Sequence, residues 1–339
     1  MPTRHVTGAR LWLAMATIYL IWGSTYLGIA VAIESLPPFL MAAIRFAIAG
    51  LLLLGWEVIR TRGHLALPSR RELRDSAIVG ALLLGIGNGF VAFGEQTVAS
   101  GIAAILVAMI PLWLVVFGRV YFRERVSRLA AVGVAVGLVG VGVLVWPAGG
   151  AGAFDPLGIA ILVLAPIGWA HGTLYSAHRA RLPRSPLTAS GLQMLAGALL
   201  LALEAVLTGE PARFQPDRIS GSSLLAIGYL VVFGSMLAFT TYAWLLRHAP
   251  LSLVGTYAYV NPIVAVALGA VFLAEPVSPR TLVASAVIVA AVAMIVTARS
   301  RSAVPAGLAP TTVATPLVPA APAPAAGRLR GVTRQAPFD

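Results

Sequence analysis

Residues 111–145 read PLWLVVFGRVYFRERVSRLAAVGVAVGLVGVGVLV, and residues 262–296 repeat the pattern 151 residues later as PIVAVALGAVFLAEPVSPRTLVASAVIVAAVAMIV. Twelve of the 35 aligned positions are identical. The identities include four pairs of residue types that shape helices and their ends: Pro111 with Pro262, Gly118 with Gly269, Glu124 with Glu275, and Ser127 with Ser278. Many secondary transporters consist of two such membrane-helix repeats around a central site. The duplication therefore favours a carrier.

The composition indicates a membrane protein. Apolar residues make up 59% of the 339 residues, charged residues only 11%, and the mean hydropathy is +0.90. So few polar groups cannot cover this apolar mass in water, and we expect the lipid bilayer to surround the chain. The absence of cysteine excludes disulfides, a thiolate nucleophile and a cysteine-based metal site. We expect neither a cofactor nor a bound metal.

Ten stretches are apolar over about the 20 residues that a membrane-spanning helix needs. They lie at about residues 11–33, 39–59, 76–98, 100–122, 128–146, 157–177, 187–208, 222–246, 251–274 and 280–298. The sequence therefore predicts an all-α integral membrane protein of ten transmembrane helices. Residues 1–10 would precede two five-helix repeats, at 11–146 and 157–298. Residues 299–339 are rich in Ala and Pro and predict a disordered cytoplasmic tail.

All 24 basic residues are arginines, and their positions predict the orientation of the helices. With the N-terminus inside, the inner segments hold 20 arginines and the outer loops only Arg213, Arg218 and Arg280. Because short cytoplasmic loops carry the excess of positive charge, both ends of the chain are predicted in the cytoplasm. The net charge of +12 then faces anionic lipid, so we expect no nucleic-acid partner. Five helices per repeat invert the second repeat relative to the first, which suits alternating access.

Four segments resemble a known family: IWGSTYLGIAVAIESLPPFLMAAIRFAIAG (21–50), ASGIAAILVAMIPLW (99–113), ERVSRLAAVGVAVGLVGVGVLV (124–145) and GTYAYVNPIVAVALGAVFLAEPVS (255–278). Over about residues 11–298 the chain resembles the EamA-type carriers of the drug/metabolite transporter superfamily, most closely the YedA-like inner-membrane exporters. This resemblance implies a ten-helix bundle that exports small metabolites, amino acids or drugs through a cavity between its halves. His171 departs from the family pattern, which usually has a plain apolar residue at that position.

Two repeat-matched prolines are candidates for a cavity wall. Pro111 and Pro262 each fall near the middle of a predicted span. A proline inside a helix leaves the carbonyl four residues earlier without its usual donor, here Val107 and Ala258. Such carbonyls are tolerated at this depth only in a protein interior or beside water. We therefore predict that both prolines, and Trp113 beside the first, line a cavity, with a simple packing kink as the alternative.

Amide and aromatic side chains supply further candidates for substrate binding. Tyr257 and Asn261 lie on one helix face, four residues apart, and Asn88 lies among glycines that allow close helix contact. For Asn88 the alternative is an interhelical hydrogen bond. Aromatic residues on the first and sixth predicted helices could flank the cavity and stack on apolar or cationic groups, or could simply pack in the core or against lipid. These residues are Trp22, Tyr26 and Trp169.

Arg45 is the only arginine well inside a predicted span, because Arg119 and Arg280 lie at the ends of theirs, and intramembrane charges are usually functional and paired. Glu34 and Glu95 lie at the outer ends of the first and third predicted helices. We predict that Arg45 pairs with Glu95 or Glu34 to close an outer gate. The alternative is that Arg45 extends to the lipid headgroups. The corresponding residue of the second repeat is Gln193.

Three other features have competing interpretations. Glu124 and Glu275 precede serines that begin helices, which favours a role at helix N-termini over catalysis. His171 is of the residue type that changes charge near neutral pH and could carry a coupled proton, although hydrogen-bonded packing is the alternative. Three glycines at helical spacing allow tight packing within the fold or between the copies of a homodimer: Gly133, Gly137 and Gly140.

These features favour a secondary carrier that exports small organic solutes, either in exchange for protons or downhill. No Walker motif is present, which argues against ATP as the direct energy source. The alternative from another class is a membrane-embedded enzyme such as a lipid-linked transferase, which needs acids or His/Asp pairs clustered near one interface. The acidic residues here are scattered, so we expect no enzyme. A midplane of amides and aromatics favours neutral, zwitterionic or monocationic substrates over polyanions.

Overall fold

The computed structural model describes residues 8–64, 66–145, 155–249 and 251–303. Within these ranges the chain forms helices and short connections, and no strand. The all-α prediction is therefore confirmed for the described residues. The last helix continues to Ala303, so the predicted disordered tail is wrong for its first residues, 299–303. The rest of that tail and residues 1–7 lie outside the described residues.

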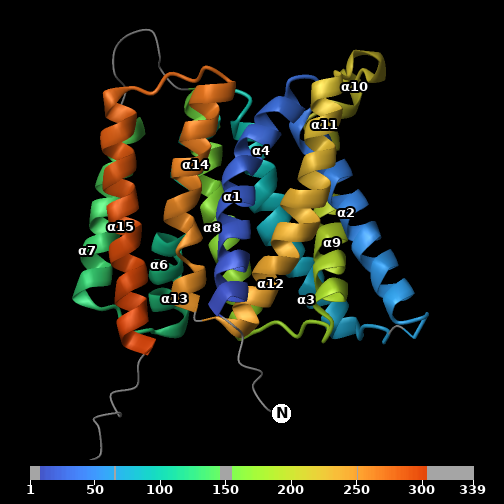
Figure 1. Ribbon diagram of the computed structural model, residues 1–339, viewed down its shortest axis with the longest axis horizontal. Helices are drawn as coiled ribbons and strands as arrows, with labels where there is room; N and C mark the ends of the chain where they lie inside the picture. Colours follow the sequence, from blue (N-terminus) through green and yellow to red (C-terminus); the bar gives the residue numbers. More distant parts are fainter. Residues whose placement is uncertain (1–7, 65, 146–154, 250, 304–339) are drawn as a thin grey trace, which may run out of the picture. The chain divides into compact units, whose positions relative to one another are not determined.

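The helices follow the two predicted repeats (Figure 1). The first repeat begins with α1 (Gly8–Ile33) and α2 (Pro38–Arg60) and ends with α7 (Arg128–Val145). Between them, its third segment consists of α3 (Arg70–Gly80), η1 (Ala81–Gly89) and α4 (Phe90–Gly94), and its fourth segment consists of α5 (Ser100–Val107) and α6 (Ile110–Phe122). The second repeat begins with α8 (Pro156–His178) and α9 (Pro186–Leu207) and ends with α15 (Pro279–Ala303). Its third segment consists of α11 (Gly221–Tyr229), η3 (Leu230–Leu237) and α12 (Ala238–His248), and its fourth segment consists of α13 (Leu251–Val254) and α14 (Tyr257–Phe272). The short helices α10 (Glu210–Arg213) and η2 (Pro216–Arg218) connect α9 to α11.

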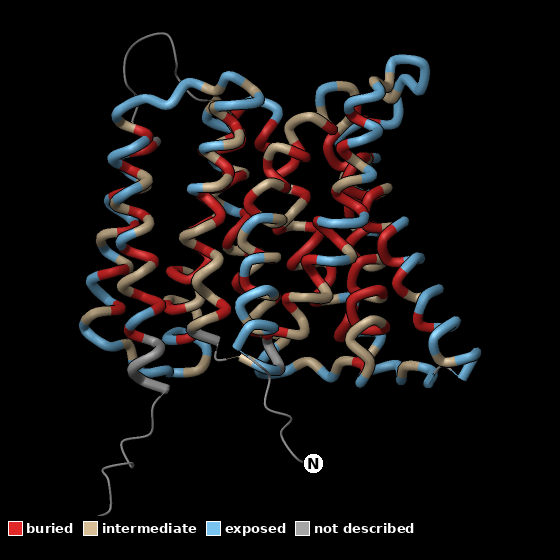
Figure 2. The backbone as a smooth tube through the Cα atoms, in the orientation of Figure 1, coloured by how far each residue is buried: buried red, intermediate tan, exposed pale blue. Residues whose placement is uncertain are grey.

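The described helices have the length and surface of membrane spans. Eight helical segments of the described chain are long and apolar enough to cross a membrane, and two further apolar helices, Arg128–Leu144 and Tyr257–Phe272, are shorter. The buried residues lie between the helices, while the outward faces are exposed (Figure 2). Large apolar side chains stand on those faces, such as Ile59 and Leu225, whose exposed fractions are 71% and 78%. Such a surface is stable only against lipid.

The third and fourth segments are distorted at corresponding places in the two repeats. The third segments contain the π-helices η1 and η3, whose i to i+5 hydrogen bonds widen the helix locally. The fourth segments are broken: α5 ends at Val107 before α6 begins at Ile110, and α13 ends at Val254 before α14 begins at Tyr257. Each repeat therefore has two irregular points in its backbone within apolar helices.

The repeat-matched glycines and glutamates form one structural unit at the end of the fourth segment. The chain turns at Arg123 and Ala274, whose φ angles are +54° and +51°. The amide of Glu275 then donates to the carbonyl of Gly269 at 3.1 Å, which closes the helix end. A Cβ at Gly269 would overlap the Glu275 carboxylate, and one at Gly118 would lie 2.7 Å from Glu124 Oε2. Glycine is therefore required for the carboxylate to fold back over the helix.

The carboxylate of Glu275 stabilises a helix of the other repeat. It accepts hydrogen bonds from the backbone amides of Ser100, at 2.7 Å, and Gly101, at 3.1 Å. These are two of the amides that the start of α5 leaves without helical acceptors. The predicted role at a helix N-terminus is thus correct for Glu275, but the helix is α5 and not the one that follows it in sequence. The serines do cap the following helices: Ser127 Oγ accepts from Ala130 N, and Ser278 Oγ from Thr281 N.

A second carboxylate also crosses between the repeats. Glu210, on the short helix α10, is fully buried and accepts hydrogen bonds from the amides of Phe39, at 3.3 Å, and Leu40, at 2.8 Å, at the start of α2. Burial raises the pKa of Glu210 above its ordinary value, and the two amide hydrogen bonds oppose that rise. Two helices of the first repeat are therefore capped by acids of the second.

The glycines of α7 are used within the fold. A Cβ at Gly133 would lie 3.0 Å from the carbonyl oxygen of Ala291, and one at Gly140 would lie 2.8 Å from Ile288 Cγ1. Both neighbours belong to α15, which lies beside α7 (Figure 1). The glycines let these two helices approach closely. They therefore supply no separate evidence for a homodimer.

Candidate functional site

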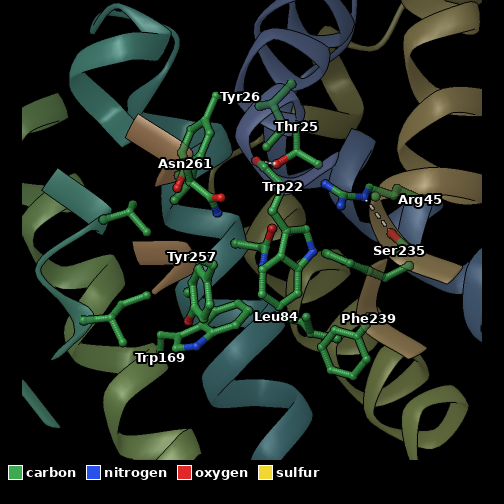
Figure 3. A pocket seen from close by; sticks show the side chains of 18 residues that line it. Trp22, Thr25, Tyr26, Arg45, Leu84, Trp169, Ser235, Phe239, Tyr257 and Asn261 are labelled. Atoms are coloured by element: carbon green, nitrogen blue, oxygen red, sulfur yellow. Dashed lines mark hydrogen bonds between the residues drawn. The ribbon is translucent and has the colours of Figure 1, made fainter. Parts of the chain in front are cut away.

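A cavity lies between the two repeats, and both contribute to its wall (Figure 3). Its 18 lining residues come from α1, α2, η1, α4, α5 and α6 of the first repeat and from α8, η3, α12 and α14 of the second. The irregular points of the backbone are the π-helices η1 and η3 and the breaks between α5 and α6 and between α13 and α14. Each of them contains a residue that lines the cavity or lies within three residues of one. The cavity volume is about 70 Å³.

Six of the nine predicted cavity residues line this space: Trp22, Tyr26, Asn88, Trp169, Tyr257 and Asn261. The prediction is wrong for Pro111, Trp113 and Pro262, which are not among the lining residues. Pro111 lies in the first turn of α6 and Pro262 inside α14, and both are buried in helix contacts. Their neighbours Val107, Ile110 and Asn261 face the cavity instead. The distorted backbone beside each proline, and not the ring, borders the space.

Trp113 packs on the other side of α6. Its ring stacks on Phe117 with the ring centroids 5.5 Å apart. It also packs against the core cluster that contains Ala130 of α7 and Ile295 of α15. Because α6 lies between this cluster and the cavity, the side chain of Trp113 is directed away from the site.

An aromatic group, defined here as Trp22, Trp169, Tyr242 and Tyr257, lies at the cavity, where Trp22, Trp169 and Tyr257 line the space and Tyr242 packs against Trp22 and Tyr257. Trp22 is its centre, with ring centroids 6.0 Å from Trp169, 4.9 Å from Tyr242 and 5.1 Å from Tyr257. The contacts to Trp169 and Tyr257 are edge-to-face, a favourable geometry for aromatic pairs. The four rings come from α1, α8, α12 and α14, so this group joins both repeats. Tyr242 was missed in the sequence because nothing distinguishes it from other tyrosines in apolar helices.

The two asparagines differ in how they are held. The amide nitrogen of Asn261 donates to the carbonyls of Tyr257, in its own helix, and Tyr19, in α1, at 3.2 Å each. Asn261 is therefore fixed in place while it lines the cavity. Asn88, in η1, forms no side-chain hydrogen bond with another described residue, so the interhelical bond proposed as its alternative is not observed. Its amide group is available to a ligand.

Arg45 lies in the cavity wall and not at a gate between paired charges. Its side chain is 4% exposed, its Nε donates to Ser235 Oγ at 2.9 Å, and its guanidinium lies 4.7 Å from the centroid of the Phe46 ring. Among the described residues no carboxylate lies within 4.0 Å of it. The predicted ion pair with Glu95 or Glu34 is therefore not formed in this conformation. The cavity also contains a fixed positive charge, which corrects the expectation of an uncharged midplane.

Neither predicted partner of Arg45 contacts it, although the carboxyl of Glu95 lies close enough for an electrostatic interaction. Glu95 follows α4, is 8% exposed, and its two carboxylate oxygens have no hydrogen-bond partner among the described residues. Glu34 lies in the exposed turn after α1. Neither residue lines the cavity.

His171 lies outside the cavity, between α8 and α6. Its Nδ1 is 2.9 Å from the carbonyl oxygen of Ile167, and its Nε2 is 3.0 Å from the hydroxyl of Tyr121. The carbonyl can only accept, so Nδ1 carries the proton and Nε2 accepts from the tyrosine. The ring also packs on Phe117 at a centroid distance of 4.1 Å. This arrangement supports the packing interpretation, and the predicted role in proton coupling stays untested.

Sequence comparison agrees with this architecture. Residues 10–146 match the EamA-like transporter family, and residues 156–297 match it a second time. The chain belongs to this family. It is 40% identical over 283 residues to the inner membrane transporter YedA of Escherichia coli strain K12, covering 83% of this chain and 89% of YedA. It is 25% identical over 290 residues to the chloroplastic WAT1-related protein At3g02690 of Arabidopsis thaliana, covering 84% of this chain and 69% of that protein.

A solved crystal structure has the same fold. It is 24% identical to this chain, with a TM-score of 0.60, and the match covers 87% of this chain and 99% of that one. Together with the family and with YedA, the apolar helices identify this EamA-family chain as a multi-pass inner membrane protein. The family and its relatives indicate transport and not catalysis.

Several lining residues escaped the sequence analysis. Ser235 and Phe239 belong to the third segment of the second repeat, and Phe46 follows Arg45. One signal was present for Ser235, because it follows a glycine in an apolar segment, as Asn88 does in the first repeat. The phenylalanines carry no such signal, since apolar residues face the core, the cavity and lipid alike.

Proposed function

We propose that this EamA-family protein is a secondary exporter of small organic metabolites that works by alternating access to the cavity between its repeats. The observation that supports it most is the position of the irregular backbone. The distorted third segments, η1 and η3, both supply lining residues, and so do the helices beside both breaks in the fourth segments. Repeat-matched interruptions next to a central site are typical of carriers whose halves move against each other.

The size of the cavity supports a mechanism with motion. Pockets that hold small organic ligands usually measure about 300–1,000 Å³, whereas this cavity measures about 70 Å³. The helices must therefore separate to admit a metabolite. The π-helical turns and the broken fourth segments are the places where this costs least, because their regular i to i+4 hydrogen bonds are already interrupted.

The arginine distribution supports an orientation with both ends of the chain in the cytoplasm. The α2–α3, α6–α7 and α8–α9 connections lie at the same end of the bundle as the start of α1 (Figure 1). These connections and the adjoining helix ends carry 12 arginines. Cytoplasmic loops hold the excess of arginine, so this end faces inward. Trp22, Tyr242 and Tyr257 pack with Met15 and Ile18, toward the start of α1, so we place the aromatic group between the cavity and the cytoplasm.

Efflux from proteoliposomes tests the proposal. Vesicles loaded with a panel of labelled amino acids and aromatic solutes are compared with and without a pH gradient. We expect wild type to release at least one solute, and Asn261→Ala to release it at least about tenfold more slowly, because an oriented amide that hydrogen bonds a ligand contributes about 1.5 kcal/mol. Ser222→Ala, at an exposed position at the start of α11 and outside the cavity, is the control and should transport normally.

The pH gradient separates the two energy sources. Acceleration of efflux by the gradient indicates proton exchange, and indifference to it indicates downhill transport. If wild-type protein releases no solute faster than empty vesicles do, or if Asn261→Ala transports at the wild-type rate, the proposal is wrong in its function or in its site, respectively.

A further inference from the structure

We propose that the substrates carry one anionic group, a carboxylate or its equivalent, on an apolar or aromatic body, and that Arg45 binds the anionic group. This inference rests on the proposed transport through the central cavity and defines the class of solute. Three observations carry it: the burial of the Arg45 charge, the orientation of its guanidinium, and the composition of the opposite wall.

No carboxylate contacts the guanidinium of Arg45 in the described part of the protein, and the buried carboxyl of Glu95 acts on it only over a longer distance. The side chain is 4% exposed, and its one hydrogen bond, from Nε, goes to the neutral hydroxyl of Ser235. Arginine cannot relieve the cost of burial by releasing its proton, as a lysine or histidine can. An unpaired charge in a membrane interior is expensive, and such charges are kept where they act on a substrate or an ion. The absence of a counter-charge in contact with the guanidinium leaves that position to a ligand.

The surroundings hold the guanidinium with its terminal nitrogens toward the cavity (Figure 3). Ser235 fixes the Nε edge, and the ring of Phe46 supports the plane at 4.7 Å. A Cβ at Gly234 would lie 3.1 Å from Nη2, so the glycine leaves room for this position. Neither terminal nitrogen has an acceptor among the described residues. Two parallel N–H groups facing an open space match the two oxygens of a carboxylate.

The remaining wall fits an apolar body. Across the cavity from Arg45 lie the rings of Trp22, Trp169 and Tyr257, with Phe239 completing the apolar lining (Figure 3). None of the described lining residues is Asp or Glu. A ligand ammonium would therefore find only neutral oxygens and aromatic faces, whereas a carboxylate finds a full charge. Electrostatic complementarity favours an anionic group and makes a cationic group optional.

A purely structural role for Arg45 makes the opposite predictions. In that case the bond between Arg45 and Ser235 would hold α2 against η3, and its loss would destabilise the protein. If the charge is instead held for a ligand, its removal leaves the ligand-free protein as stable or more stable, because the cost of burying an unpaired charge disappears. The thermal stability of ligand-free Arg45→Gln separates the two. Glutamine is also the residue at the matching position of the second repeat.

The binding test uses three probes with one body and different head groups. They are 3-phenylpropanoate, 3-phenylpropan-1-ol and 3-phenylpropan-1-amine, titrated onto the full purified chain in detergent by calorimetry. We expect wild type to bind the carboxylate at least about tenfold more tightly than the alcohol or the amine, as a charge-assisted hydrogen-bond pair provides. Arg45→Gln should lose this preference, Arg45→Lys should keep part of it, and Arg125→Gln, at an exposed loop arginine, should keep all of it.

The outcomes distinguish this inference from the transport proposal. The inference is overturned if wild type binds the three probes equally or binds none, or if Arg45→Gln keeps the carboxylate preference. It is also overturned if ligand-free Arg45→Gln melts at a clearly lower temperature than wild type. In each of these cases, Asn261-dependent efflux of a solute would still support transport through the cavity. If Arg45→Gln cannot be purified, the head-group preference of wild type and its change in Arg45→Lys remain decisive.

Discussion

The two repeats share their backbone irregularities but not their polar side chains. Both have a π-helical third segment, a broken fourth segment, a glycine under a folded-back glutamate, and a serine cap on the last helix. The polar residues differ: η1 supplies Asn88 to the cavity and η3 supplies Ser235, while the second helices carry Arg45, which lines the cavity, and Gln193, which does not. In the proposed mechanism, the shared backbone serves the motion and the unshared side chains serve recognition.

The matched glutamates of the two repeats differ in their exposure. Glu210 and Glu275, both in the second repeat, cap α2 and α5 of the first. The first-repeat counterpart of Glu275 is Glu124, whose side chain is 43% exposed and lies 3.8 Å from His178. Substitutions at the two matched glutamates can measure whether this difference in exposure is also a difference in stabilisation.

The largest effect on stability is expected when an arginine is introduced into the second repeat at the position that matches Arg45 of the first. Gln193 is 6% exposed in α9 and lies outside the cavity, in a region where α9 touches the backbone of α3 so closely that a Cβ at Gly80 would overlap the Gln193 carbonyl. Gln193→Arg should therefore cost about 3 kcal/mol of unfolding free energy, the expense of an arginine at a helix centre. Unfolding in mixed detergent micelles measures this loss.

Gln193→Leu is the matched control, because it has similar volume and no charge, and it should change stability by much less than the arginine does. The comparison between the repeats fails if Gln193→Arg is as stable as wild type and also binds 3-phenylpropanoate more tightly. That result would mean that the second repeat can also form an anion site, and that the two repeats differ in sequence but not in their capacity to bind an anion.

A smaller loss is expected at the carboxylate that links the repeats. Glu275→Gln removes a charged acceptor from two amides of α5 and should cost about 2 kcal/mol. Gly269→Ala should cost about as much, because a methyl group there displaces the same carboxylate. The two losses should not add in the double variant, since both remove one interaction. Melting temperatures of the purified variants measure all three.

The matching pair in the first repeat sharpens this test. Glu124→Gln and Gly118→Ala change the same motif, but the Glu124 side chain is nearly half exposed, so its loss should be smaller than that of Glu275. Equal losses of stability in the two repeats would show that Glu124 and Glu275 contribute equally to folding, and would contradict the difference inferred from their exposure.

Much of the fold follows from the sequence. The ten apolar stretches, the repeat offset and the serine caps were all readable, because membrane helices must satisfy their backbone internally and are therefore long and apolar. The π-helical turns of η1 and η3 were not readable, since their residues also suit ordinary helices. The acceptors of Ser100 and Gly101 were missed for a related reason: Glu275 lies 175 positions further along the chain, and sequence spacing shows only local caps.

The sequence predicted those site residues that are chemically distinctive in an apolar helix, but it did not predict in which direction a side chain points. Asn88, Asn261 and Arg45 stood out as polar groups in apolar helices, and all three line the cavity. Pro111 and Trp113 were predicted from their depth in the membrane, yet they face neighbouring helices. The depth of a residue does not determine the face of the helix on which its side chain lies. The predicted ion pair of Arg45 is not formed, because Glu34 and Glu95 were chosen for ending helices on the same outer side, and a shared side does not bring two side chains into contact.

The smallest effect is expected at His171, and it decides which group carries a proton if transport is proton-coupled. His171→Phe should cost only about 1 kcal/mol, since it removes the hydrogen bonds to Tyr121 and to the Ile167 carbonyl but keeps an aromatic ring against Phe117. Because the ring lies outside the cavity, the dependence of efflux on a pH gradient should be unchanged. Glu95→Gln is the informative comparison, since that buried carboxyl has no described hydrogen-bond partner. Loss of the gradient effect in His171→Phe, with Glu95→Gln unaffected, would show that protons travel between α6 and α8 and not along the cavity.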